Sequence, residues 1–598
     1  MSAPALSRLD VDRTSTRARP RPRPRPGLAN DPGRWRQRLA LAIILAVFAG
    51  RCGWVAVNDS ITPDETTHLV HCLHFWMTGD DLGMWELGTP RLPHVLNALP
   101  PYLALRLAGR LPIDASKKEE AIAALVLGGS SRVLVPARAM AIGAGMALVL
   151  VVGWATGRRR GAVAGLIAGG LVSSVPEVLA HSAIAGSDVP FAAAAFLAIG
   201  LLARYAERPS PGRWLAASLG VGLAWAMRHT GLLLIPVAGG VHLVCALRRP
   251  RERGAGPAVE CLLGSALAGA VLAAVAFLVL WAGDGFGTVS IGGVSARATS
   301  LSVPRRVGPV ELGGVPVPTS ALSVLKQVRH QNAGHEAYFC GAFRQSGWPS
   351  YFPVAFLLKT PLGLIALLVL AAARLRPRDA LDRVGLACLA LLWLTLVRSK
   401  VNIGVRYALL TYPIVIPWVA RLFEGKALRD KVWGPATVAA AVWFVGASAW
   451  AHPRYLSYFN EIGGGPGRGW LYLADSNLDW GQDFDALAAT LRRLGIKEVT
   501  ADLSTERRLN EPGLFAVVNP PRDAQVPAVT PIHRRLYDCD GDYIPVYTRY
   551  VAVGASRLLG LYSQNDMGWL MTRRLVARVN DSTFLFDMDT PADRPFAP

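Results

Sequence analysis

The stretch LALAIILAVFAGRCGWVAV, residues 39–57, decides the fold because it is almost entirely apolar and long enough to cross a bilayer as one helix. Runs of this kind recur through most of the chain. We count about eleven, at about 39–57, 133–156, 161–177, 189–205, 214–228, 230–248, 260–283, 351–373, 384–398, 404–422 and 432–451. The composition agrees, since 52% of the 598 residues are hydrophobic, only 18% are charged and the mean hydropathy is +0.31. The sequence therefore predicts an α-helical polytopic membrane protein.

The net charge of the chain, +21 at pH 7, comes from lysines and arginines at the ends of the apolar runs. Nucleic-acid binding would instead require basic patches with interleaved aromatic residues, so the sequence argues against that class. The basic clusters fall at 158–160, 204–213, 248–253, 374–383 and 421–431. Under the positive-inside rule they lie in the cytoplasm with the Arg/Pro-rich tail at 1–38, which is expected to be disordered and shows no signal-peptide cleavage site.

The opposite, outer face then receives two long loops and the end of the chain. The loops are 58–132 and 284–350, within a transmembrane domain at 39–451. Residues 452–598 contain no run that could span, and they predict a small extracytoplasmic α/β or α+β domain. Its expected elements are a helix at 485–494 and strands at 499–503, 514–518, 549–553 and 583–586.

The sequence TPDETTH, residues 62–68, follows the first apolar run and carries the acidic pair Asp64-Glu65. Carboxylates beside a hydrocarbon layer are costly unless they are paired, protonated or hydrated, so they mark chemistry or transport. Their place in a loop, outside the span, favours a reaction at the membrane surface over an ion path. The alternative is structural, with Asp64 capping a helix.

Other charged residues gather near the outer ends of later spans. Asp188 stands at the mouth of the fourth span, where it either reacts or caps the helix that Pro190 opens. Lys359 lies about 12 Å inside its span, at about 1.5 Å per residue, and must snorkel or face a polar cavity, where a phosphate would satisfy it. Arg228 and Arg406 lie near the same face, and the guanidinium of Arg406 suits phosphate with its paired donors.

Two further patterns allow two interpretations each. Asp64, His68 and His71 have the i, i+4, i+7 spacing of one helix face, which is able to hold a divalent metal, although histidines here equally suit packing or the interface. The motif DSNLDWGQD, residues 475–483, combines residue types that bind sugars. We favour a structural turn into the 485–494 helix, with Asp483 near its cap, and place acceptor recognition second.

The order of these motifs resembles a known family. The acidic pair after span one and the carboxylate before span four are followed by KTP at 359–361 and Asn-x-Gly-x-Arg-Tyr at 402–407. This order resembles the polyprenyl-phosphate-sugar-dependent glycosyltransferases of the GT-C fold. Within that group it is most similar to the protein O-mannosyltransferases (glycosyltransferase family 39-like) and the bacterial transferase that adds aminoarabinose to lipid A. The resemblance covers roughly residues 39–460, and HEAYF at 335–339 is similar to an outer loop of the bacterial members.

The resemblance implies an inverting transfer from a lipid-linked phosphate to an acceptor hydroxyl. It assigns Asp64 as general base, with a pKa raised by the dry membrane face, and Glu65 as support for substrate binding or orientation. Asp188 matches a second acidic position tied to metal or acceptor. Arg228, Lys359 and Arg406 become the donor phosphate-binding candidates. The substrate-binding candidates are His68, His181, His335, Glu336, Tyr338 and Tyr407. No cofactor is certain, and a divalent metal, held by Asp64 and Asp188, stays open.

The expected partners are a polyprenyl-phosphate sugar, membrane lipid and an acceptor that is a protein, a glycolipid or a polysaccharide. The expected location is the inner (plasma) membrane of a bacterium. Two competing functions predict different features. A transporter or flippase of lipid-linked sugars would show internal repeats and charges at mid-bilayer, whereas the charges here lie near the outer ends. A non-catalytic envelope scaffold would not need the intact Asp64 and Asp188.

Overall fold

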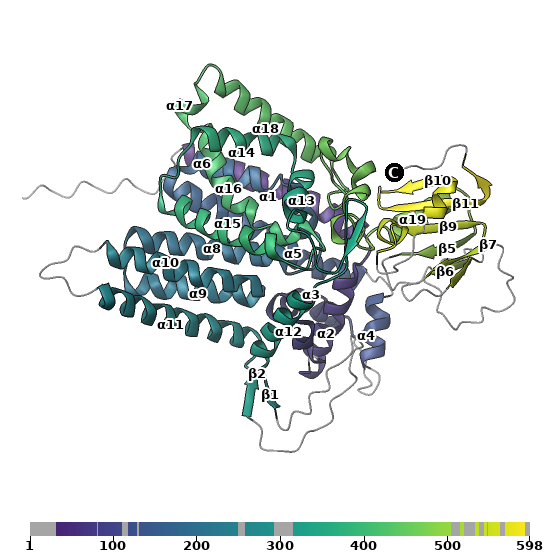
Figure 1. Cartoon of the computed structure of the whole chain (residues 1–598), viewed down its shortest axis with the longest axis horizontal. Helices are drawn as coiled ribbons and strands as arrows, with labels where there is room; N and C mark the ends of the chain where they lie inside the picture. The colour runs from purple at the N-terminus through teal and green to yellow at the C-terminus, as the bar shows by residue number, and fades with distance from the viewer. Residues whose placement is uncertain are drawn as a thin grey trace, which may run out of the picture.

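The computed structural model describes residues 32–80, 82–110, 118–127, 131–248, 258–291, 315–503, 515–518, 533–537, 543–546, 548–561 and 568–592. These residues form a body of long helices with a small sheet unit at one end, drawn in yellow in Figure 1. The body helices are α1 (Pro32–Asn58), α5 (Ser131–Arg160), α6 (Ala162–Val172), α7 (Pro176–Ser182), α8 (Asp188–Glu207), α9 (Pro211–Met227), α10 (Leu234–Leu247), α11 (Ala258–Gly283), α13 (Tyr351–Lys359), α14 (Leu362–Arg374), α15 (Ala380–Arg398), α16 (Thr411–Val419), α17 (Gly425–Leu428) and α18 (Trp433–Trp450).

The polytopic helical fold class is confirmed. Within the described residues, six single helices are long and apolar enough to cross a membrane, and two bent helix pairs raise the number to eight. Each of the eleven predicted ranges coincides with a helical segment. The remaining three segments are α9, α18 and the run η4 (Val405–Ala408), α16 and η5 (Ala420–Phe423). One boundary was wrong, because the first helix already begins at Pro32, inside the predicted tail, whose residues 1–31 lie outside the described residues.

The two bent pairs break their spans at points that matter for the site. Helices α6 and α7 meet at 71°, and α13 and α14 meet at 111°. At the second break, Pro361 lacks an N–H donor and disfavours helical geometry at Thr360. The Asn460 side chain donates to the carbonyls of Leu357 and Thr360, at 2.5 and 2.8 Å. The break therefore exposes polar backbone only where another segment satisfies it.

The loops between the first two spans and after α11 also contain helices and short strands. They contain α2 (Pro63–Thr78), η1 (Met84–Leu87), α3 (Leu92–Leu107), α4 (Lys118–Leu127), β1 (Thr288–Ile291), β2 (Val315–Pro318), α12 (Thr319–Ala333), β3 (Ala337–Phe339) and β4 (Ala342–Arg344). β1 pairs with β2, and β3 with β4, as antiparallel hairpins. Helices α2, α3 and α12 lie together beside the ends of the long helices (Figure 1).

The end of the chain forms the small mixed sheet unit that the sequence predicts. Its five-stranded sheet has the order β10-β11-β9-β5-β6, in which β5 runs parallel to both β9 and β6. The elements are η6 (Glu461–Gly463), η7 (Pro466–Leu471), η8 (Asp475–Asn477), α19 (Phe484–Arg493), β5 (Glu498–Asp502), β6 (Phe515–Val518), β7 (His533–Tyr537), β8 (Tyr543–Val546), β9 (Tyr550–Gly554), α20 (Ala555–Leu558), η9 (Gly568–Thr572), β10 (Arg573–Val579) and β11 (Thr583–Pro591). The predicted helix and four strands are confirmed as α19, β5, β6, β9 and β11.

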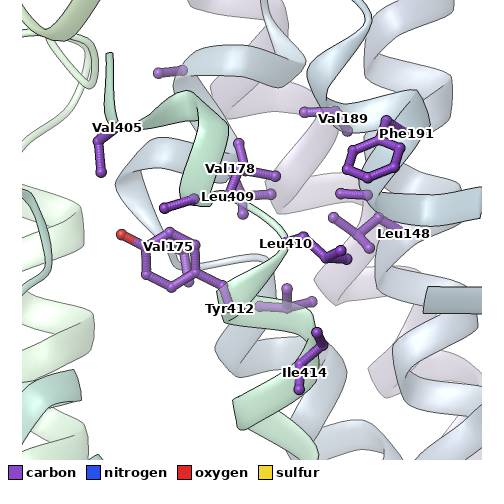
Figure 2. Close-up of a cluster of buried hydrophobic side chains, with 14 of the residues drawn as sticks. Leu148, Val175, Val178, Val189, Phe191, Val405, Leu409, Leu410, Tyr412 and Ile414 are labelled. Carbon is purple, nitrogen blue, oxygen red and sulfur yellow. The ribbon is translucent and has the colours of Figure 1, made fainter. Parts of the chain in front are cut away.

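A buried apolar cluster holds the segments that carry the site (Figure 2). Leu409 and Tyr412 of the η4–α16 run pack with Val178 of α7 and with Val189 of α8 in one continuous core. Val405 belongs to the same core and immediately precedes Arg406, while Val189 immediately follows Asp188. Apolar packing therefore fixes the backbone on both sides of a charged pair that is 218 residues apart in sequence.

Candidate active site

Two carboxylates and two guanidinium groups from four distant segments meet at one end of the helical body. Arg406 of η4 donates from Nη1 to Asp64 Oδ2 at 2.9 Å and lies 3.8 Å from Asp188 Oδ2. Arg228, at the end of α9, forms an ion pair with Asp188. Asp64 is the accessible member, since 43% of its side chain is exposed against 5% for Asp188 and 10% for Arg406. Of the predicted candidates, the structure thus brings Asp64, Asp188, Arg228 and Arg406 together.

The start of α2 explains why the Asp64 carboxylate is available. Thr62 is the N-cap residue, and its hydroxyl accepts from the Glu65 N–H at 3.3 Å while the Glu65 carboxylate accepts from the Thr62 N–H at 3.0 Å. This capping box satisfies the helix terminus without Asp64. The capping interpretation of Asp64 is therefore wrong, and its side chain points to Arg406 instead.

Asp188 is likewise not a cap. It is the first residue of α8, whereas the N-cap position is held by Ser187, which makes no side-chain cap bond. Its carboxylate is 5% exposed and faces Arg228 and Arg406. A buried carboxylate needs such compensation, which the two arginines supply to Asp188 at the edge of the site.

Aromatic rings support both guanidinium groups. The Arg228 guanidinium lies 4.5 Å from the centre of the Tyr407 ring, and Arg406 lies 4.3 Å from the centre of the Trp480 ring. Both distances suit a cation–π contact, which also restricts the orientation of the cation. Tyr407 was predicted to bind substrate, and in the structure its ring contacts the Arg228 guanidinium. Trp480 lies in the DSNLDWGQD motif and was not among the predicted site residues.

The DSNLDWGQD motif contacts both the segment that carries Arg406 and the segment that precedes Asp64. The Asn477 side chain accepts from the Val405 N–H at 2.8 Å, and the Gln482 carbonyl accepts from the Ser60 N–H at 2.8 Å. A side chain at Gly404 would collide with Ser476, so glycine permits this close approach. The segment therefore clamps η4, which carries Arg406, to the link before α2, which carries Asp64. This supports the structural interpretation of the motif and explains why its tryptophan reaches the site.

Asp483 was expected near the cap of the helix that is now α19, and it lies there without capping the helix. It occupies the N-cap position of α19, but its carboxylate accepts from Asn580 at 2.8 Å and from Ser582 instead of capping the helix. Burial raises the pKa of Asp483 well above its usual range, against the bonds from these two residues. The side chain therefore ties the helix start to the β10–β11 turn.

Glu65 is buried in an ion pair that orients the site. Arg138 of α5 donates from Nε and Nη2 to the two Glu65 oxygens, each at 2.8 Å, and both side chains are 0% exposed. The Ala185 N–H donates to the same carboxylate at 2.8 Å. Glu65 therefore links α2, α5 and the segment that leads to Asp188. Of its two predicted supporting roles, orientation fits this geometry and direct substrate binding does not, because no part of the side chain is accessible.

The prediction that Lys359 binds the donor phosphate requires a correction. Its ammonium group is 0% exposed, pairs with Glu177 at 3.0 Å and donates to the carbonyls of Leu456 and Asn477, each at 2.6 Å. These three acceptors use all three donors of an ammonium group, so none remains for a donor phosphate. The sequence could not show this, because the break at Pro361 turns the residue away from lipid and into the core.

His181 extends from this buried pair toward the site. Its Nε2 lies 3.4 Å from Glu177, and its ring meets Trp480 edge to face at 6.2 Å between ring centres. It is 4% exposed. The predicted substrate-binding role of His181 is therefore replaced by contact with the tryptophan that supports Arg406.

The histidines of α2 do not converge on a metal. His68 stacks on His94 of α3 at 3.7 Å, while His71 is turned outward and bonds the Thr67 carbonyl at 2.8 Å. Burial lowers the pKa of His68 to about 4, against the opposing charge of Asp64, so its imidazole is neutral near pH 7. In the described residues, no group of three or more His, Cys, Asp or Glu side chains is arranged to hold a metal ion. The neutral His68–His94 pair thus forms a polar wall beside Asp64.

Three predicted substrate-binding residues of the outer loop lie in β3 or directly before it. Tyr338 of β3 donates its hydroxyl to the Leu471 carbonyl at 3.0 Å and is 6% exposed, so it braces the loop against η7. The centre of the His335 ring lies 5.4 Å from that of His330 of α12, and the His335 backbone N–H donates to the Lys400 carbonyl. Glu336 follows His335 in the link to β3. The contacts of Tyr338 and His335 brace the β3–β4 hairpin against η7, α12 and the link at Lys400.

The expected raised pKa of Asp64 is also wrong. Burial raises this pKa, but the Arg406 charge and hydrogen bond, with smaller contributions from His68 and Arg228, hold it below its usual range. Asp64 is therefore ionised well below neutral pH in the unliganded arrangement. The sequence placed Asp64 beside a dry surface and did not identify the cation that faces it.

Comparison with known proteins gives one family match and several similar solved structures. Residues 121–281 match the model of a family described as dolichyl-phosphate-mannose-protein mannosyltransferase, a region that includes Asp188 and Arg228. No curated protein matches the sequence significantly. Among solved structures, the chain is similar to ArnT from Cupriavidus metallidurans bound to undecaprenyl phosphate, at 12% identity and a TM-score of 0.43, covering 93% of this chain and 99% of that one. It is also similar to the oligosaccharyltransferase AglB from Archaeoglobus fulgidus in complex with an inhibitory peptide and a dolichol-phosphate, at 11% identity and a TM-score of 0.39, covering 91% and 73%.

With the family match, the resemblance to GT-C glycosyltransferases of the protein O-mannosyltransferase type is confirmed. The fold defines the class as a multi-pass membrane protein, and one region of it is similar to dolichyl-phosphate-mannose-protein mannosyltransferases.

Proposed function

We propose that this protein transfers a sugar from a polyprenyl-phosphate carrier to an acceptor hydroxyl at the outer membrane surface, with inversion and with Asp64 as general base. One observation carries the proposal: an accessible carboxylate lies in direct contact with a guanidinium, beside a second carboxylate–guanidinium pair. A base and two fixed cations within one cluster are the groups that such a transfer requires.

The arginines supply the contacts for the phosphate of the donor. Arg228 and Arg406 are held by aromatic rings at 4.5 and 4.3 Å, so their positions are set before a ligand arrives. Arg406 Nε is buried and has no acceptor in the described part of the chain. A phosphate that binds these guanidinium groups competes with the carboxylates for their donors. Donor binding therefore frees Asp64 from Arg406 at the moment when a base is needed.

The transfer step follows from this arrangement. Asp64 accepts the proton of the acceptor hydroxyl as its oxygen attacks the anomeric carbon from the face opposite the phosphate. The bond from that carbon to the phosphate oxygen breaks, its electron pair stays with the polyprenyl phosphate, and Arg228 and Arg406 neutralise the charge that develops there. The neutral His68–His94 pair beside Asp64 offers hydrogen bonds to a sugar without adding charge.

The outer direction is supported by the two ends of α5. Arg138, near the site, and Arg160, at the arginine-rich end, are separated by about 33 Å of helix at about 1.5 Å per residue. That length is close to the roughly 30 Å of a hydrocarbon core, so the site and the arginine-rich end lie at opposite surfaces. The positive-inside rule then assigns the site to the outer surface, together with α19, whose Asp485 accepts a hydrogen bond from Ser60. A plasma-membrane protein with a cytoplasmic amino terminus fits this orientation.

The first test is donor turnover by the full chain in proteoliposomes. We expect release or transfer of sugar from one member of a panel of radiolabelled polyprenyl-phosphate sugars that includes mannose and aminoarabinose. The acceptors offered are a hydroxyl-bearing peptide, a lipid A-like glycolipid and a polysaccharide. Movement of intact donor across the bilayer without sugar release would reject the transferase and favour a transporter.

Arg406→Gln should change the pH dependence of the reaction. Arg406 lowers the pKa of Asp64, so its removal raises that pKa, and the base is then lost by protonation at higher pH. The acidic limb of the kcat/KM profile should move to higher pH, and kcat/KM at neutral pH should fall by about 10- to 100-fold, as expected for one charged hydrogen bond to phosphate.

Two variants serve as controls for this profile. Arg406→Lys keeps the charge and should leave the acidic limb near its original pH. Arg454→Gln removes an exposed arginine that pairs with Asp581 and should change neither quantity. An unchanged acidic limb in Arg406→Gln would contradict Asp64 as the base.

A further inference from the structure

A cavity lined by arginines lies at the end of the helical body opposite the Asp64 cluster. Its volume is about 380 Å³, and its lining consists of Arg158, Arg159, Arg204, Glu207, Arg208 and Arg213. These residues come from the ends of α5 and α8 and the start of α9, and α8 packs against both of the other helices. Five arginines and a single glutamate therefore line one space.

Most of this charge is not compensated within the protein. Glu207 pairs with Arg159 at 3.0 Å, and Arg213 donates to the carbonyls of Arg204 and Arg208 at the end of α8. The guanidinium groups of Arg158, Arg204 and Arg208 have no side-chain partner in the described part of the chain. Arginines at a helix C-terminus offset the helix dipole, but that interaction does not require several of them to face one cavity.

A second, independent observation points to a missing acceptor. The Arg159 side chain is only 9% exposed, and its Nη2 is buried without an acceptor among the described residues. Its Nε and Nη1 are already bonded to Glu207 and to the Ala155 carbonyl. A buried guanidinium donor without a partner is costly, and a phosphate oxygen in the cavity would satisfy it.

The surroundings of the cavity indicate where the phosphate comes from. Trp154 lies one helical turn before Arg158 and is 41% exposed, while Leu215 and Leu219 follow Arg213 on α9 and are 51% and 47% exposed. Exposed apolar side chains beside an arginine layer are typical of the membrane interface, where tryptophan is also enriched. A ligand that combines a phosphate with acyl chains would cover both surfaces.

We propose that this cavity binds the phosphate headgroup of an anionic phospholipid of the cytoplasmic leaflet. The proposal concerns a site distinct from the one that carries the reaction, and it does not depend on the proposed function. A basic pocket between helix ends on the cytoplasmic side is suited to such headgroups. The lipid would tie the ends of α5, α8 and α9 together on the face opposite the reaction.

The test is native mass spectrometry of the full-length, delipidated protein with phosphatidylglycerol or phosphatidylcholine. We expect one phosphatidylglycerol retained per chain and much weaker retention of phosphatidylcholine. Arg158→Gln and Arg159→Gln should each weaken phosphatidylglycerol binding by about tenfold, the loss of one charged contact. Because the Arg158 side chain has no partner within the described residues, its variant should keep the lipid-free unfolding temperature of the wild type.

The matched control is Arg248→Gln, which removes an exposed arginine at the end of α10, outside the cavity. Lipid binding that falls as much in this control would overturn the proposal, because it would reflect general attraction to a basic surface. A separate arm titrates inorganic phosphate alone. Protection from thermal unfolding by phosphate that phosphatidylglycerol neither reproduces nor displaces would identify a free-anion site and reject the lipid.

Discussion

Replacement of Asp64 by asparagine should lower kcat for sugar transfer by about 10²- to 10⁴-fold, the range expected for loss of a general base. The variant keeps the size of the side chain and an oxygen that accepts from Arg406, so the geometry of the site should persist. Binding of the polyprenyl-phosphate sugar should change only a few-fold, because the arginines that hold the phosphate remain. Single-turnover kinetics with a saturating donor separate these two effects.

The stability of this variant should stay close to that of the wild type. The pair between Asp64 and Arg406 is partly hydrated, with 43% of the Asp64 side chain exposed, and such pairs contribute about 1 kcal/mol or less. Asp80→Asn is the matched control, since Asp80 lies just beyond the other end of α2, is exposed and is remote from the cluster. Retention of more than a tenth of wild-type kcat by Asp64→Asn would remove Asp64 from the catalytic role.

Removal of Arg138 should have the largest effect on stability. Its five N–H donors are all used, two on Glu65 and three on the carbonyls of Ala56, Asp59 and Ser60, at 2.7–3.1 Å. In Arg138→Met the Glu65 carboxylate stays buried without its cation, and the three carbonyls lose their donor. Breaking a buried ion pair in this way costs about 3–5 kcal/mol. The measurement is unfolding in detergent, followed by tryptophan fluorescence.

Two comparisons make this result specific. Arg374→Gln breaks a pair with Asp430 whose side chains are 29% and 32% exposed, and it should cost about 1 kcal/mol or less. The double variant Arg138→Met with Glu65→Gln removes both charges and should recover part of the loss, because no unpaired charge remains. A single Arg138→Met variant as stable as Arg374→Gln would show that the pair does not hold the start of α2.

The sequence alone predicted four of the residues that the structure brings together at one end of the helical body. Asp64, Asp188, Arg228 and Arg406 stand out because charged residues at the ends of apolar runs are costly and hence informative. The long helices and four of the five strands of the described C-terminal sheet follow from periodicity and composition, which depend on neighbours in the chain. These signals depend on residues close in the sequence, so they can be recognised without knowledge of the tertiary packing.

Only the tertiary structure decided which of these charges are available. Glu65 and Lys359 resemble site residues in sequence, but each is fully buried against a partner far along the chain, Arg138 and Glu177. Trp480 reaches the site only because the 475–483 motif clamps the link before α2 to η4. The physical reason is that a charge acts according to its partner and its burial, and both are set when helices distant in sequence pack together.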